Sequence, residues 1–292
     1  MFTVALAGNP NCGKTTIFNA LTGANQHVGN WPGVTVEKKE GRLRFGGNQY
    51  NIVDLPGTYS LGAYSEDEIV ARDFILKDKP DLVVSVVDAT NIERNLYLTV
   101  QLLEMGANVV IALNMMDEAQ ERGIKIDVDS LQRQLGVPIV PMIASRQKGI
   151  DDLKSIISEA IKKNAAEPVK ITYGRKIDEA VASLAQIIKQ SASINDYPAD
   201  WVALKLLEND KYILDYASKQ APHISDKAAA YINDLTKSLG IEPEMAIVDK
   251  RYEFIKDVVS GSIIKPKQQI KTTSDKIDKV LTHKWFGLPI FA

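Results

Sequence analysis

The sequence predicts an α/β domain with a mostly parallel sheet, followed by a small all-α helical bundle. Over residues 1–165, apolar runs of strand length alternate with amphipathic stretches of helical length, which is the pattern of repeated strand–helix units. Over residues 168–262 no further strand is predicted, and apolar residues recur with the roughly 3.6-residue period of helices. We assign residues 263–292 to a linker that leads toward a membrane region.

The composition is that of a globular protein without a marked charge preference. The chain has 292 residues, 45% of them hydrophobic and 25% charged, and a formal net charge of −2. No basic surplus of the kind that nucleic-acid binding needs is present. The single cysteine excludes an internal disulfide framework and agrees with a cytoplasmic setting. No run of about 18 apolar residues occurs, and no secretion signal precedes the first apolar run.

A phosphate-binding motif lies between the first predicted strand, residues 2–7, and the first predicted helix, residues 15–21. Residues 8–15 read GNPNCGKT and fit G-x-x-x-x-G-K-[ST]. Glycines let such a loop turn its backbone N–H groups toward a phosphate, and the positive end of the helix adds to the attraction. Lys14 is expected to reach the terminal phosphates, and the Thr15 hydroxyl to bind Mg²⁺. The alternative is an ordinary glycine-rich turn. The predicted strand before the motif and the predicted helix after it favour the phosphate-binding loop over this alternative.

A loop rich in glycine, asparagine and proline is predicted at residues 22–35, where the sequence has no periodicity. We expect this loop to be mobile. Thr35 is the candidate for a second hydroxyl ligand of Mg²⁺, the contact that orders such a loop around a γ-phosphate. We expect Trp31 to be exposed. Its side chain could form a lid over the nucleotide, contact a partner or simply pack on the protein, and we favour packing together with a role for its backbone.

Two further strands lead to a candidate metal-binding carboxylate. Residues 42–46 and 50–53 are predicted to form a hairpin through a glycine-rich turn. The second strand runs into D-x-x-G at residues 54–57, where open parallel sheets bind their ligands. Asp54 could hold Mg²⁺ through water, and the Gly57 N–H could bond the γ-phosphate. A D-x-x-G alone is a weak signal, but it is a strong one at this distance after a phosphate loop.

The next strands carry a candidate purine-reading acid. Residues 81–88 and 108–113 are predicted core strands, with a helix at 96–105 between them, and the second strand ends in NMMD at 114–117. Asp117 alone could be a helix cap. As a site residue, its carboxylate would accept hydrogen bonds from N1–H and the exocyclic amine of guanine, and would stay unpaired against adenine. The predicted nucleotide is therefore GTP rather than ATP.

These motifs, in this order, resemble those of the translation-factor-related GTPases, and in detail those of the bacterial ferrous iron transport protein B (FeoB) family. The G domain of that family carries G-N-P-N-x-G-K-T, N-W-P-G-V-T, D-L-P-G-x-Y-S and N-M-x-D, which residues 8–15, 30–35, 54–60 and 114–117 match. The resemblance implies a P-loop GTPase domain of Ras-like fold and a helical domain that favours GDP retention. Met115 departs from the wider pattern, because a lysine usually lies along the base there.

The last base-contacting loop is expected at residues 144–146, after a predicted strand at 138–140. The usual Ser-Ala-Lys is replaced here by Ala-Ser-Arg. From this loop the resemblance carries over the Ser145 N–H contact to the guanine carbonyl. The residues expected to contact GTP or GDP are Gly8, Asn9, Pro10, Asn11, Cys12, Gly13, Lys14, Thr15, Thr16, Gly33, Val34, Thr35, Asp54, Leu55, Pro56, Gly57, Asn114, Met115, Asp117, Ala144 and Ser145.

The side chains that usually assist GTP hydrolysis are missing from the motifs. Thr58 stands where many GTPases have a glutamine, and no arginine lies in the loop at 22–35. The Asn11 carboxamide, with the backbone carbonyls of Gly29 and Trp31, could hold K⁺ against the phosphates and supply the missing positive charge. This resembles the potassium-activated GTPases; in the alternative, Asn11 only shapes the loop. Catalytic roles are expected for Asn11, Lys14, Thr35 and Gly57.

The second half of the chain is predicted to be helical and to carry no site chemistry. A helix at 149–164 closes the first domain, and helices follow at 177–188, 201–207 and 213–216. Ser225 is expected to cap a helix that Gly240 ends, and Pro243 to start another that runs to about residue 260. His223 is expected to lie in a surface loop.

The C-terminal residues suggest the start of a membrane segment. Lys276, Lys279 and Lys284 precede the apolar aromatic run at 285–292, and such an order is typical of the cytoplasmic side of a transmembrane helix. We expect a cytosolic fragment of a longer protein at the inner membrane. The alternatives are a tail that packs on the bundle and a weak interfacial anchor.

The leading functional prediction, through the resemblance, is a GTPase that gates ferrous iron entry through its own transmembrane region. Small cytosolic accessory proteins could bind as further partners, and the chain could form a homo-oligomer. Binding of nucleic acid is not expected. The alternatives are a soluble ribosome- or tRNA-related GTPase and a nucleotide-dependent interaction module that does not hydrolyse GTP. No iron-ligand set is visible, since the chain has one cysteine and three scattered histidines.

Overall fold

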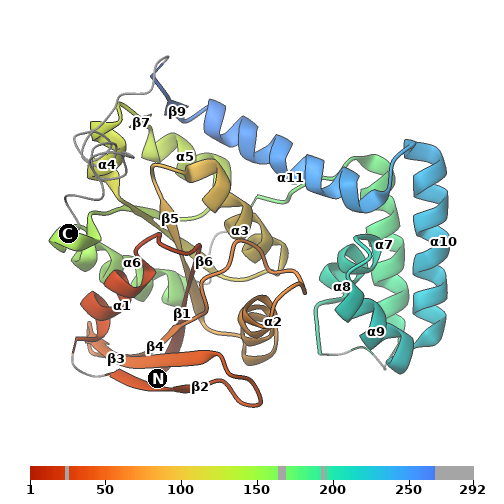
Figure 1. Cartoon of the computed structure of the whole chain (residues 1–292), viewed down its shortest axis with the longest axis horizontal. Coiled ribbons are helices and arrows are strands. Elements are labelled where there is room, and N and C mark those ends of the chain that lie inside the picture. The colour runs from red at the N-terminus through yellow and green to blue at the C-terminus, as the bar shows by residue number, and fades with distance from the viewer. Residues whose placement is uncertain (24–25, 164–168, 192–193, 195, 267–292) are drawn as a thin grey trace, which may run out of the picture.

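The computed structural model describes residues 1–23, 26–163, 169–191, 194 and 196–266. An α/β unit and a helical unit lie side by side, and the long helix α11 runs from the helical unit back across the α/β unit (Figure 1). This is the predicted order of an α/β domain followed by a helical bundle. Among the described residues, no helix combines the length and the apolar character that crossing a membrane requires.

The described part of the α/β unit contains a seven-stranded sheet in the order β2-β3-β4-β1-β5-β6-β8. Strand β1 pairs in parallel with β4 and β5, and the parallel ladder continues through β6 to β8, whereas β2 and β3 are antiparallel. The predicted hairpin is present as β3 and β4. The strands are β1 (Phe2–Gly8), β2 (Gln26–Asn30), β3 (Glu37–Phe45), β4 (Asn48–Asp54), β5 (Leu82–Asp88), β6 (Val109–Asn114) and β8 (Ile139–Pro141).

Helices cover both faces of this sheet, because alternate residues of the central strands are apolar on both sides. On β1, Val4 and Leu6 pack in one buried cluster and Ala5 and Ala7 in another. The helices of the α/β unit, with two short helical turns η1 and η2, are α1 (Lys14–Thr22), α2 (Glu66–Asp73), η1 (Phe74–Asp78), α3 (Ile92–Glu104), α4 (Met116–Glu121), α5 (Val128–Leu135), η2 (Ala144–Arg146) and α6 (Ile150–Lys163).

The helical unit shares its hydrophobic core with one face of the α/β unit. The cluster that contains Leu96 of α3 continues into the bundle, where it includes Leu184, Trp201 and Ile247. The two units therefore meet through buried apolar surface rather than through a solvated hinge. The bundle helices are α7 (Arg175–Gln190), α8 (Ala199–Leu207), α9 (Lys211–Gln220), α10 (Pro222–Leu239) and α11 (Pro243–Ser260).

A buried charge network also crosses between the units. Arg251 of α11 donates two hydrogen bonds to the Glu104 carboxylate on α3, at 2.6 and 2.8 Å, and a further one to Glu208 next to α8. Lys205 donates to the other oxygen of Glu208 at 2.7 Å. Burial alone would raise the pKa of Glu208, but the charges of Lys205 and Arg251 outweigh it and lower that pKa to about 2.

The loop predicted at residues 22–35 is partly a strand. Residues 26–30 form β2, which pairs with the first half of β3, from Gln26 opposite Gly41 to Asn30 opposite Glu37. All five side chains of β2 are exposed. An edge strand without a buried face gives no alternation of apolar residues, so the sequence pattern could not reveal it.

Two expectations for the helical half are wrong in detail. Helix α10 begins at Pro222, with Ala221 and not Ser225 in the capping position, so His223 lies in the first helical turn and not in a loop. Proline is favoured at the first position of a helix, where its missing N–H costs nothing. A short strand also begins the segment predicted as a linker, because β9 (Ile263–Ile264) pairs with β7 (Lys125–Ile126). The predicted membrane-proximal segment at 276–292 lies outside the described residues.

Candidate nucleotide-binding site

The predicted phosphate loop connects β1 to α1 in a conformation that two of its glycines permit. Gly13 has φ +89°, and a Cβ there would lie 2.2 Å from Nδ2 of Asn114. A Cβ on Gly8 would lie 2.9 Å from the Val86 carbonyl oxygen. Asn11 also has a positive φ, of 66°, which asparagine tolerates better than most residues. The loop therefore packs closely against β5 and Asn114, and only glycines fit at these two positions.

A hollow of about 500 Å³ opens above this loop. Phosphate-loop residues line it together with Gly57 from D-x-x-G and Met115 from the NMMD loop, so the structure brings three separate motifs to one place. The Asn9 side chain is buried, and its amide has no hydrogen-bond partner among the described residues. A polar ligand fits such a site. The lining residues are Asn9, Pro10, Asn11, Gly13, Lys14, Thr15, Thr16, Gly57 and Met115.

Lys14 and Asp54, two predicted ligand-binding residues, form an ion pair with each other. Lys14 Nζ lies 2.5 Å from Asp54 Oδ1, and both side chains are largely buried. Burial raises the pKa of Asp54, although the Lys14 charge acts against this rise. A phosphate would compete for Lys14, and a cation for Asp54, so a ligand carrying both charges can replace this internal pair.

Asn114 links two of the loops that surround the hollow. Its Nδ2 donates to the Cys12 carbonyl at 3.0 Å, and its Oδ1 accepts a hydrogen bond from the Ala144 N–H at 3.0 Å. Asn114 is buried, at 4% exposure, so these bonds are not exchanged with water. In this arrangement Asn114 fixes the phosphate loop relative to the last base-contacting loop.

Asp117 has a partner that sequence reasoning did not find. Its Oδ1 accepts a hydrogen bond from the Glu118 N–H at 3.1 Å, and its Oδ2 lies 3.6 Å from Nη2 of Arg146. Arg146 is 63% exposed, so this pair is weak and can open when a ligand approaches. The sequence feature that could have indicated this ion pair is the arginine of the Ala-Ser-Arg loop, which also carries the exposed Ser145.

The residues of the predicted switch loop lie elsewhere in this structure. Thr35 is exposed, and the lining of the hollow contains none of the described residues 26–36. The Trp31 N–H donates to the Val36 carbonyl at 2.9 Å, and the Trp31 carbonyl accepts a hydrogen bond from the Val34 N–H at 3.3 Å. Gly29 belongs to β2. The structure therefore does not bring Gly33, Val34, Thr35, Gly29 or Trp31 to the phosphate loop.

Trp31 is buried and not exposed as expected. Its side chain is 8% exposed and meets the Phe74 ring edge-on, with centroids 5.3 Å apart. Lys38 Nζ lies 4.8 Å from the centroid of the indole ring. The packing alternative was therefore the right one of the three. The π-helical turn η1, which the sequence did not predict, provides the apolar surface for the indole.

The segment that follows D-x-x-G is held by a backbone hydrogen bond to the phosphate loop and by side chains that the sequence analysis missed. The Thr58 N–H donates to the Gly8 carbonyl at 3.3 Å. Further along, Gln101 of α3 accepts a hydrogen bond from the Leu61 N–H at 2.7 Å, and Glu68 of α2 accepts one from the Ser60 hydroxyl at 2.6 Å. A buried glutamine on an otherwise apolar helix face is the one local signal that could have indicated Gln101.

We expect the replacement of Gly13 by alanine to weaken nucleotide binding by at least about 100-fold, or about 3 kcal/mol. The added Cβ would displace the Asn114 amide and force a strained φ, so the phosphate loop and the Ala144 loop would separate. Titration with a fluorescent guanine nucleotide measures the effect. Gly106→Ala is the matched control, since Gly106 also has a positive φ but no atom near its missing Cβ. Equal affinities for the two variants would contradict the prediction.

Comparison with known proteins identifies the family. The model of the ferrous iron transport protein B family matches residues 2–157, and the model of the FeoB cytosolic helical domain matches residues 173–264. This chain belongs to the FeoB family. The Fe(2+) transporter FeoB of Methanocaldococcus jannaschii is 47% identical over 288 residues, which are 98% of this chain and 42% of the relative. The Fe(2+) transport protein A/Fe(2+) transporter FeoB fusion protein of Porphyromonas gingivalis is 43% identical, over 99% of this chain and 35% of its own length.

Solved structures of FeoB cytosolic domains share the fold. The T. maritima domain in a GDP form is 37% identical, with a TM-score of 0.78, over 90% of this chain and 98% of that one. The S. thermophilus N11A variant bound to mGDP is also 37% identical, with a TM-score of 0.81, over 90% of this chain and 99% of that one. The predicted family and the predicted fold, a P-loop GTPase domain followed by a helical domain, are therefore confirmed. This chain spans 42% of the length of the Methanocaldococcus jannaschii relative and 35% of the length of the Porphyromonas gingivalis relative.

Proposed function

We propose that this chain binds GTP and hydrolyses it to GDP and phosphate, and that it does so as the cytosolic part of a ferrous iron transporter. The observation that carries the proposal is the hollow where the phosphate loop, Gly57 and the NMMD loop meet. FeoB cytosolic domains of T. maritima have been solved in GDP and GMPPNP forms, which supports a guanine nucleotide as the ligand. The curated relatives named Fe(2+) transporter support the wider role.

The residues of the hollow, together with Asp54 and Asp117 near it in the motifs, would carry out the binding steps. The backbone N–H groups of the phosphate loop and the start of α1 would bind the phosphates, and Lys14 would leave Asp54 to pair with the terminal ones. Thr15 and the freed Asp54 would hold Mg²⁺, which neutralises charge on the phosphates when bound. Asp117 would leave Arg146 and accept the two guanine N–H groups.

The switch loop must rearrange before it can take part. Thr35 can reach a phosphate-bound cation only if residues 31–36 leave the turn that the Trp31 hydrogen bonds close. The Trp31 side chain would then leave the Phe74 ring, at a cost of buried apolar surface. We therefore assign the present arrangement to an open state of the switch, which a triphosphate would convert.

The wider role is a nucleotide-dependent gate for ferrous iron at the cytoplasmic face of the inner membrane. The membrane region of the relatives would be the partner. Small accessory proteins are candidates, because one relative is a fusion of Fe(2+) transport protein A with FeoB. A ribosome- or tRNA-related role would need a basic surface, which the net charge of −2 does not favour. A non-hydrolysing interaction module is the other alternative, and the following experiment separates it.

Potassium should accelerate phosphate release from GTP by at least about tenfold over sodium. No arginine or glutamine lies at the expected catalytic positions, so a cation bound by the Asn11 carboxamide would supply the stabilising charge. Asn11→Gly should remove most of the potassium response, because it removes the carboxamide that would bind the ion. Glycine accepts the positive φ of Asn11, so the loop itself should not be strained.

GDP affinity is the control for this variant and should change little. The S. thermophilus N11A variant bound to mGDP supports this expectation. An equal rate in potassium and sodium would overturn the potassium proposal. No phosphate release in either salt would favour the interaction module.

A further inference from the structure

Two buried side chains hold neighbouring residues of the segment that follows D-x-x-G. Gln101 of α3 accepts the hydrogen bond from the Leu61 N–H at 2.7 Å, and Arg72 of α2 donates through Nη1 to the Gly62 carbonyl at 3.2 Å. Arg72 is 0% exposed and Gln101 is 4% exposed. The segment that starts at Gly57 is thus fixed four to five residues later from two helices of the α/β unit.

Arg72 also reaches the helical bundle. Its Nη1 lies 3.5 Å from Oδ2 of Asp210, and its guanidinium carbon lies 4.5 Å from the centroid of the Tyr212 ring and 5.8 Å from that of Trp201. Asp210 caps α9 by accepting a hydrogen bond from the Ile213 N–H. One guanidinium therefore contacts the Gly62 carbonyl on one side and the start of a bundle helix on the other.

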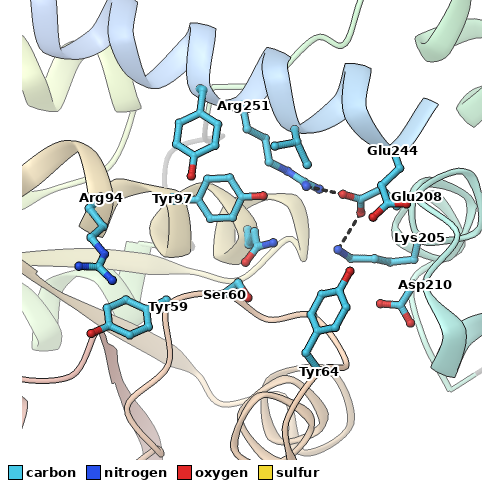
Figure 2. Close-up of a pocket in the computed structure, with 14 residues that line it drawn as sticks. Tyr59, Ser60, Tyr64, Arg94, Tyr97, Lys205, Glu208, Asp210, Glu244 and Arg251 are labelled. Carbon is cyan, nitrogen blue, oxygen red and sulfur yellow. Dashed lines mark hydrogen bonds and ion pairs between the residues drawn. The ribbon is translucent and has the colours of Figure 1, made fainter. Parts of the chain in front are cut away.

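A cavity of about 420 Å³ separates the rest of this segment from the bundle. Figure 2 shows Tyr59, Ser60 and Tyr64 on one wall, and Lys205, Glu208 and Glu244 on the facing side. Gly62 and Asp210 both belong to the lining, so Arg72 bridges the two walls at the edge of the cavity. The open space leaves the segment room to shift, and the Arg72 contacts limit that shift.

A fully buried arginine in an aromatic and apolar interface is costly unless its contacts compensate the lost hydration. Arg72 Nε and Nη2 have no hydrogen-bond partner among the described residues, and Nε lies 3.7 Å from Oδ1 of Asp73, its neighbour on α2. A methionine or leucine of similar volume would pack equally well at this position in the interface. The polar contacts to Gly62 and Asp210 are therefore the feature that only an arginine provides here.

We propose that Arg72 is a positioning residue for GTP hydrolysis, which sets the place of Gly57 at the terminal phosphate and makes it depend on the helical bundle. This inference rests on the proposed GTPase function. A shift of the Leu61–Gly62 peptide would move Gly57 through only four intervening residues, and small misplacements at a reacting phosphate have large effects on rate. The nucleotide-binding residues themselves do not touch Arg72, so affinity for GDP should not depend on it.

The test compares GTP turnover and GDP affinity in the complete chain with Arg72→Met, Arg72→Lys and Asp210→Asn. We expect Arg72→Met to lower kcat at least about tenfold, with GDP affinity and KM nearly unchanged and with partial recovery in Arg72→Lys, which keeps the charge but not the planar fork. Asp210→Asn should lower kcat in the same direction, although it lies in the bundle, because asparagine keeps the helix cap but loses the ion pair.

Arg94→Met is the matched control, since Arg94 lines the same cavity but is exposed and contacts the Tyr59 ring. Its kcat should equal that of the wild type. If wild-type protein hydrolyses GTP and the Arg72 and Asp210 variants keep its kcat, or lose affinity and turnover equally, the inference is overturned. If wild-type protein shows no hydrolysis under potassium, the proposed function fails instead. Should Arg72→Met not fold, Asp210→Asn and Arg72→Lys still decide the question.

Discussion

Replacing Arg251 with methionine should lower the free energy of unfolding by about 3–5 kcal/mol. The change leaves the buried carboxylates of Glu104 and Glu208 without the guanidinium that binds both. Because Glu104 belongs to α3 and Arg251 to α11, the loss acts on the junction between the two units. Chemical denaturation followed by far-ultraviolet circular dichroism measures the effect.

The neighbouring lysine gives a matched control for this prediction. Lys250 lies on the same helix and pairs with Glu253, but both side chains are largely exposed, so Lys250→Met should change stability little. Combining Arg251→Met with Glu104→Gln should recover part of the loss, because Glu208 keeps Lys205 as its partner and no uncompensated carboxylate then stays buried. Wild-type stability of Arg251→Met would show that the network contributes nothing.

Replacing Asp117 with asparagine should lower GTP affinity by about 100- to 10,000-fold and raise affinity for the xanthosine analogue. The carboxylate of Asp117 can only accept hydrogen bonds, which suits the N–H groups of guanine. The asparagine amide would place a donor against one of them, whereas xanthine offers a carbonyl oxygen at that position. Competition between labelled guanosine and xanthosine diphosphates measures the exchange of specificity.

Glu118→Gln is the control, because the Glu118 backbone N–H that contacts Asp117 stays in place. Its guanosine affinity should match that of the wild type. Loss of both nucleotides in Asp117→Asn, with the fold intact, would mean that Asp117 supports the loop rather than reads the base. Unchanged preference for guanosine would remove Asp117 from the site altogether.

Much of the candidate site could be predicted because its chemistry is tied to local backbone patterns. Residues 8–15 follow a buried strand and open a helix, so their spacing alone places N–H groups and Lys14 at a phosphate. Asp54 ends β4 beside β1, as the position of D-x-x-G after a predicted strand required. The same holds for Asn114 at the end of β6.

The missed features depend on exposure or on distant partners. Strand β2 has no buried face, so its pairing with β3 left no trace in the apolar pattern. Trp31 is buried in a hydrophobic cluster where Phe74, distant in the sequence, packs against it. The contacts of Arg72 with Asp210, and of Arg251 with Glu104, join residues more than a hundred positions apart, which no spacing rule connects.

The sequence by itself therefore determined the order of the core strands and of the helices that flank the motifs, the phosphate-binding loop and the residues offered to a purine, since short-range geometry specifies each of them. Only the tertiary structure decided that Lys14 pairs with Asp54, that Asn114 joins two loops, and that the helical unit shares its core and charges with the α/β unit. The physical reason is that burial and pairing are properties of surfaces that meet only after the chain has folded.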